Sequence, residues 1–225
     1  MGTGIWSTLW VLVKKELRLE LRRQAVLSGI ALYLFSLVFI GYLIFRMRQN
    51  SLNDNTWSAL FWLIVLFAVV NGVAKSFMEE KKGVFIYLYA MASPQSIILS
   101  KILYNGLLCT FLSLLGYGLM HLFLGSPIVH HGVFFTTLVL ASFGFSSSLS
   151  LISGIASKAS NSNVLMAVLS FPVVIALLLI SIGLTKSAIL GLDWEDSWRS
   201  LLNLVAINSI SSALAYLLFP YIWRS

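Results

Sequence analysis

The chain has 225 residues, of which 59% are hydrophobic and 10% charged, and its mean hydropathy is +0.91. Soluble domains carry about 25% charged and 45–50% apolar residues, so this composition excludes a water-soluble globule and favours a membrane protein with several spans. A single cysteine, Cys109, excludes an internal disulfide framework and any multi-cysteine metal site. In so apolar a chain, the net charge of +7 indicates cytoplasmic loops rather than nucleic-acid binding.

Residues 1–24 predict an amphipathic helix that lies in the membrane interface. Its apolar residues recur every four positions from Leu9, and a basic stripe runs parallel to them. Tryptophans would sit at headgroup depth and basic side chains would face anionic lipid. The interfacial residues are Trp6, Trp10, Lys14, Arg18 and Arg22. The alternative is a topology anchor with no further role.

The uncharged stretches predict six membrane-spanning helices in one transmembrane domain, residues 1–225, and so an all-α polytopic fold. The longest stretch, 102–157, divides at the turn signal Gly125-Ser126-Pro127. These runs are continuous rather than alternating, which argues against a β-barrel. The expected spans are about 25–45, 55–74, 102–124, 133–157, 163–185 and 201–223.

The distribution of lysine and arginine predicts that both termini are cytoplasmic. With six crossings from a cytoplasmic N-terminus, eleven of these residues lie inside and four outside. Cytoplasmic retention of Lys and Arg sets topology, so this asymmetry fixes the orientation. We place Lys101 in the inside segment that precedes the third span.

The cytoplasmic segment between the second and third spans carries an unusual pattern. Opposite charges in 75–83 are followed by a nine-residue apolar stretch, 84–92, and then by Ser93-Pro94. The apolar stretch is too short to cross a bilayer, and a solvated loop has no need of it. An exposed apolar patch of this kind indicates a partner surface. The alternative is an interfacial helix that packs only on its own protein.

Four stretches together resemble one family of membrane proteins. They are Lys15-Glu16-Leu17-Arg18-Leu19-Glu20, the loop from Phe77 to Lys101, Ser153-Gly154-Ile155-Ala156, and 164–172. With the length and the six spans, they are similar to ABC-2-type exporter permeases, and within that group to the CcmB family of the cytochrome c maturation (System I) haem exporter.

The resemblance implies a permease of the bacterial inner membrane that is not itself an enzyme. A separate CcmA-like ATPase would drive it through a cytoplasmic coupling helix, and this chain carries no phosphate-binding Gly-x-x-x-x-Gly-Lys-[Ser/Thr] loop. Other implied partners are a CcmC-like subunit that handles haem, a small CcmD-like subunit and a second permease copy, with no cofactor bound directly by this chain. The coupling residues would be Glu79, Glu80, Gly83, Tyr87, Leu88 and Pro94.

Polar residues elsewhere allow structural and functional interpretations. The fourth predicted span carries small side chains every four residues, which suits close helix packing better than a transport path. They are Ser142, Ser146, Ser150 and Gly154. We also expect interhelical contacts from Asn71, Asn105, Asn203 and Asn208. His121, His130 and His131 could ligate haem, but a surface loop is the interpretation that we favour.

Two other functions stay open at the level of sequence. The chain could be an ABC-2 permease for polysaccharide, lipid or drug, or a membrane scaffold that transports nothing. An intramembrane enzyme would need a nucleophile paired with a base, which the sequence does not offer. No acidic or basic residue falls in the middle of a predicted span, which argues against an ion-coupled carrier.

Overall fold

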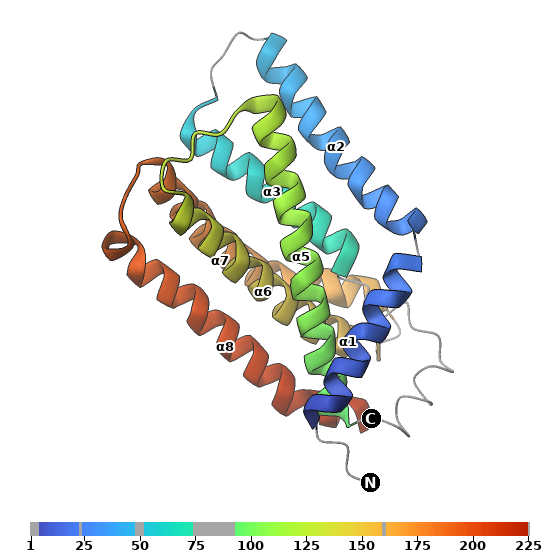
Figure 1. Ribbon diagram of the computed structural model, residues 1–225. Coiled ribbons are helices and arrows are strands. Elements are labelled where there is room, and N and C mark those ends of the chain that lie inside the picture. The colour runs from blue at the N-terminus through green and yellow to red at the C-terminus, as the bar shows by residue number, and fades with distance from the viewer. Residues whose placement is uncertain (1–4, 23, 48–51, 74–92, 159–160, 225) are drawn as a thin grey trace.

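The computed structural model describes residues 5–22, 24–47, 52–73, 93–158 and 161–224, which form seven α-helices (Figure 1). Six of these helices are long and apolar enough to cross a membrane, and α1 is shorter. The described residues contain no strand, so the predicted all-α architecture with six spans is confirmed. The helices are α1 (Ile5–Arg22), α2 (Gln24–Met47), α3 (Asp54–Val73), α5 (Pro94–Leu124), α6 (His131–Ala156), α7 (Ser162–Ile189) and α8 (Trp194–Arg224).

Two helices begin earlier than the charge pattern predicts. Helix α5 begins at Pro94 instead of 102, because Ser93 caps it and proline suits the first helical position. The Ser93 hydroxyl accepts a hydrogen bond from the Ser96 N–H at 3.3 Å. Helix α8 begins at Trp194 instead of 201, with two acidic residues in its first turn, where the helix dipole favours negative charge.

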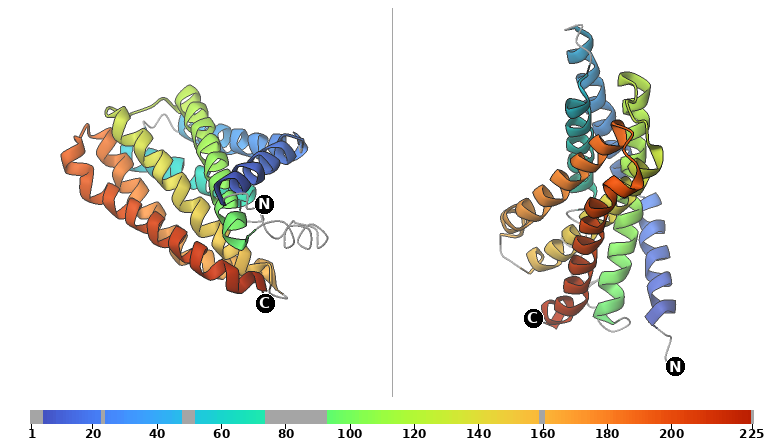
Figure 2. Two further views of the ribbon diagram at one scale, coloured as in Figure 1. Left: turned by 60° about the horizontal axis from the view of Figure 1, so that its bottom comes forward. Right: turned by 90° about the vertical axis from the view of Figure 1, so that its left-hand side faces the viewer.

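Helix α6 is the centre of the bundle. It packs against α5, α7 and α8, while α3 bridges α5 and α7 and α2 lies against α3 and α5 (Figures 1 and 2). The predicted turn separates α5 from α6, since α5 ends before Gly125, whose φ of 77° is readily adopted only by glycine. The main apolar core therefore surrounds α6 and draws on every helix from α2 to α8.

A second, smaller apolar cluster closes one end of the bundle. It joins α1, α5, α6 and α8 through buried side chains. Helix α1 begins and α8 ends at this same end, as six crossings require (Figures 1 and 2). The members of the cluster are Leu12, Ile97, Ile98, Ile102, Leu151, Ala215 and Phe219.

Candidate functional site

Helix α1 packs on the first half of α5, at the end of the bundle that holds both termini (Figures 1 and 2). The contact face of α1 consists of Leu9, Leu12 and Val13, which are 5%, 8% and 4% exposed. Their spacing of three and four residues places them on one side of a helix. The next position on that side is occupied by Glu16, so a carboxylate points at α5 where an apolar residue would continue the stripe.

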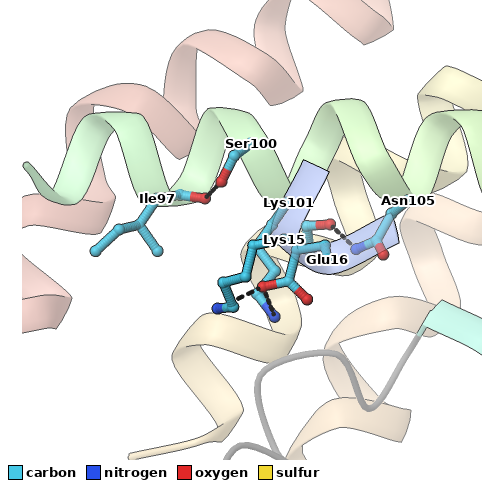
Figure 3. Close-up of polar contacts among 7 residues, drawn as sticks. Lys15, Glu16, Ile97, Ser100, Lys101 and Asn105 are labelled. Carbon is cyan, nitrogen blue, oxygen red and sulfur yellow. Dashed lines mark hydrogen bonds and ion pairs between the residues drawn. The ribbon is translucent and has the colours of Figure 1, made fainter. Parts of the chain in front are cut away.

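Glu16 meets a lysine of α5 that is almost fully buried. Its Oε1 lies 3.0 Å from Nζ of Lys15 and 3.5 Å from Nζ of Lys101, and Figure 3 shows both ammonium groups approaching this one carboxylate oxygen. The side chains of Lys101 and Glu16 are only 4% and 14% exposed, whereas that of Lys15 is 31% exposed. Because a buried charge is stable only when paired, the Glu16 carboxylate of α1 helps to stabilise the Lys101 ammonium.

This ion pair corrects the placement of Lys101 in a cytoplasmic segment ahead of the third span. Lys101 lies in the second turn of α5 and is buried there. Sequence reasoning missed the pair because it assigned every charge to water and ended the span at the charge. The available signal was Glu16 in register with Leu9, Leu12 and Val13 on α1.

The rest of α1 has an exposed apolar flank and an exposed basic side. Trp10 and Leu17, from the predicted apolar stripe, are 56% and 48% exposed. Lys14 and Arg18 are exposed on the side away from α5. They line a groove of about 360 Å³, together with Val11, Lys15 and Leu19. The side chains of Trp6 and Arg22 lie outside the described residues. An apolar flank beside a basic side suits a position at the membrane surface.

Of the predicted coupling residues, the structure describes only Pro94, which forms the first turn of α5. The others, Glu79, Glu80, Gly83, Tyr87 and Leu88, lie outside the described residues. What the structure adds is the position of Pro94. The segment 74–92 leads directly into the capped start of a 31-residue helix, whose first turns belong to the cluster at the end of the bundle.

All four small residues of the fourth predicted span are buried, and the three serines bond to α5. Ser150 Oγ accepts a hydrogen bond of 2.8 Å from Asn105 Nδ2. The Ser146 hydroxyl donates to the carbonyl of Ile102 at 2.6 Å, and the hydroxyls of Ser142 and Ser113 lie 3.2 Å apart. A row of interhelical hydrogen bonds therefore runs along α5 and α6, and on α5 it begins at Ile102, the residue after Lys101.

The asparagines divide into two groups. Asn105 and Asn208 bond to α6, the second through a 2.9 Å hydrogen bond from Nδ2 to the carbonyl of Leu140. Asn71 is exposed and donates to the carbonyl of Phe67 in its own helix, so the expectation of an interhelical contact is wrong there. Asn203 is exposed on α8. Ser148, which the sequence did not single out, bonds to Ser211 of α8 at 3.2 Å.

The histidines lie at the opposite end of the bundle, and His130 has a structural role there. Its Nδ1 accepts the Val133 N–H at 3.2 Å and so caps α6, while its Nε2 lies 3.8 Å from a carboxylate oxygen of Asp193. His121 and His131 are exposed. Within the described part of the chain, no three His, Cys, Asp or Glu side chains are grouped as a metal site would require.

Comparison with known proteins identifies the family. The family model described as CcmB protein matches residues 7–220, which is nearly the whole chain. No curated protein and no solved structure matches the chain. The six apolar helices agree with this match, since they indicate a protein embedded in a membrane. The chain therefore belongs to the CcmB family, the membrane permease subunits of the cytochrome c maturation haem exporter.

Proposed function

We propose that this permease converts ATP hydrolysis on a separate ATPase subunit into movement of its membrane helices, and that the end of the bundle formed by α1 and α5 receives the motion. The protein acts in the bacterial inner membrane with both termini cytoplasmic. Haem is handled by a partner membrane subunit, and this chain supplies the moving helices.

The observation that carries this proposal is the start of α5. A capped helix of 31 residues follows directly after the segment 74–92, and its first turns pack against α1, α6 and α8. A force on the residues before Ser93 would reach three other helices through one packed cluster. Side chains in such a cluster are close-packed, so a displacement of α5 is passed on to its neighbours.

The test is the recovery of the ATPase with a variant of the segment before α5. Glu79→Lys and Glu80→Lys, combined with Tyr87→Ser and Leu88→Ser, should leave membrane insertion intact, because added positive charge strengthens the cytoplasmic preference. The four changes should strongly reduce ATPase recovery in a detergent pull-down, because apolar anchors dominate interface energy and reversed charges repel the partner. Formation of c-type cytochromes should fall in parallel.

A matched control reverses two acids at the other end of the bundle. Glu195 and Asp196 are exposed in the first turn of α8, so their change to lysine alters charge equally without touching the proposed docking segment. This control should recover the ATPase as the parent does. Unchanged recovery in the fourfold variant would contradict docking at 75–92 and leave that segment as an interfacial helix.

A further inference from the structure

The ion pair between α1 and α5 has a role that apolar packing could not supply. We infer that Glu16 and Lys101 are positioning residues that fix the register of α1 on α5, so that movement of α5 is passed through α1 to α2. This inference rests on the proposed function, because it concerns how motion that enters at α5 is distributed. It gives α1 a mechanical role beyond that of a membrane anchor.

The first argument is the surroundings of the pair. It continues the apolar face formed by Leu9, Leu12 and Val13 and lies next to the cluster that contains Ile97 and Ile102. Two apolar residues of similar volume would pack there with equal or greater stability, since desolvation offsets much of the attraction between buried charges. Stability alone therefore does not explain a carboxylate and an ammonium at these positions.

The second argument is that apolar contacts alone specify register poorly. Apolar burial is non-directional, so a shifted or rotated α1 could repack with other aliphatic side chains in the contact, whereas the charges of Glu16 and Lys101 pair only when these two side chains lie opposite each other. A shift of α1 by one turn, about 5.4 Å, that brings Leu12 to the position of Glu16 would place an aliphatic side chain against the nearly buried ammonium of Lys101, whereas the opposite shift would bring Glu20 there. The pair thus opposes the first of these shifts and the rotation of α1 about its own axis.

The third argument is the connectivity of the pair to other helices. Helix α1 ends at Arg22 and α2 begins at Gln24, so only one residue separates them and α1 cannot shift without acting on α2. On the other side, Asn105 lies one turn after Lys101 and bonds to Ser150 of α6 at 2.8 Å. Successive polar contacts therefore link α1 to α5 and α5 to α6.

The test compares three variants of the full complex with its ATPase, each reconstituted in lipid nanodiscs. Glu16→Leu with Lys101→Met keeps an apolar, packed contact and removes the charges. Glu16→Lys with Lys101→Glu exchanges the charges and can re-form the pair. Glu16→Gln alone removes the carboxylate that α1 places beside Lys101 and should lower the melting temperature, because breaking a buried pair on one side is destabilising.

If the pair fixes the register of α1 on α5, the apolar pair should lower the cytochrome yield without lowering the stability of the protein. The apolar pair should keep the parent's melting temperature and its bound ATPase, but yield at least about fivefold less c-type cytochrome per permease, the lower range of typical coupling effects. The exchanged pair should recover most of that yield. Spin labels at Val11 and Leu107, both exposed, should give one narrow distance in the parent and the exchanged pair and a broadened one in the apolar pair.

Two outcomes would overturn the inference. A normal cytochrome yield with the apolar pair would show that Glu16 and Lys101 only fill space. A low cytochrome yield with a narrow spin-label distance in the apolar pair would show that Glu16 and Lys101 do not fix the register of α1. Failure of the proposed function gives a different result, because then the unmodified chain would not recover the ATPase at all.

Discussion

Gly144 lies where α6, α7 and α8 meet, and its side chain is a single hydrogen atom. A Cβ at this position would lie 2.7 Å from Oδ1 of Asn208 and 2.8 Å from Cδ2 of Leu177. The absence of a side chain lets α7 and α8 approach α6, and places Asn208 where its amide reaches the carbonyl of Leu140. Small residues at helix interfaces in membranes have this effect in general.

Gly144→Ala should therefore destabilise the protein by about 1–3 kcal/mol, the usual range for overpacking a close contact. The measurement is thermal unfolding in detergent, followed by intrinsic fluorescence. Gly118→Ala is the matched control, because nothing lies within 4 Å of a Cβ there. Since alanine favours helix more than glycine does, the control should unfold at the same or a higher temperature. Equal melting temperatures for the two variants would contradict the role given to Gly144.

Two buried indole groups connect α3 to the rest of the bundle. Trp62 donates through Nε1 to the hydroxyl of Thr185 on α7 at 2.8 Å, and Trp57 donates to the carbonyl of Gly125 at 3.0 Å. Interhelical hydrogen bonds in membranes average about 0.6 kcal/mol, so these two contribute more to orientation than to stability. They hold α3 in register with α7 and with the turn after α5.

At the scale of the element, α1 has a separate environment on each of its sides. One side buries Leu9 and Leu12 against α5, and the opposite side carries the groove lined by Lys14 and Arg18. Because α2 follows α1 after one residue and spans the membrane, α1 must lie near the membrane surface. A groove with basic walls and apolar edges at that depth suits the headgroup of an anionic phospholipid.

Changing Lys14 and Arg18 to glutamine should lower the affinity for phosphatidylglycerol. Each basic residue near an anionic surface contributes about 1 kcal/mol, so each change should weaken binding about fivefold. The measurement is the bound phosphatidylglycerol per protein after detergent extraction, counted by mass spectrometry. Lys186→Gln with Arg199→Gln is the control, since both residues are exposed towards the other end of the bundle. Equal lipid retention in the two double variants would contradict lipid binding by α1.

At the scale of the whole molecule, the arrangement of the helices bears on topology. Helix α1 begins and α8 ends at the same end of the bundle (Figure 1). The topology predicted from the sequence assigns eleven of the fifteen basic residues to the cytoplasmic side. A reporter fused after Arg224 should therefore indicate cytoplasm, and reporters at Asn53 or Asp193 the periplasm. Paired alkaline phosphatase and fluorescent protein fusions measure this directly. A periplasmic signal after Arg224 would contradict the six-span topology.

The sequence by itself determined the class of the protein, the number of its spans and its family. These conclusions depend on hydrophobic length, on the count of basic residues and on stretches that run in order along the chain, and none of them requires knowledge of which helix touches which. The turn at Gly125 was likewise predictable, because the conformation that ends α5 is a local property of glycine.

Only the tertiary structure decided which polar residues meet. The sequence predicted a solvated Lys101, because a charge near the end of a span ordinarily faces water. In the structure Lys101 is buried and paired with Glu16 of α1, which is distant in sequence. The sequence allowed His130 as a haem ligand, whereas in the structure its Nδ1 caps α6, which depends on the direction in which the chain enters that helix. Burial and pairing depend on neighbours distant in sequence, and hydropathy along a single chain carries no record of those neighbours.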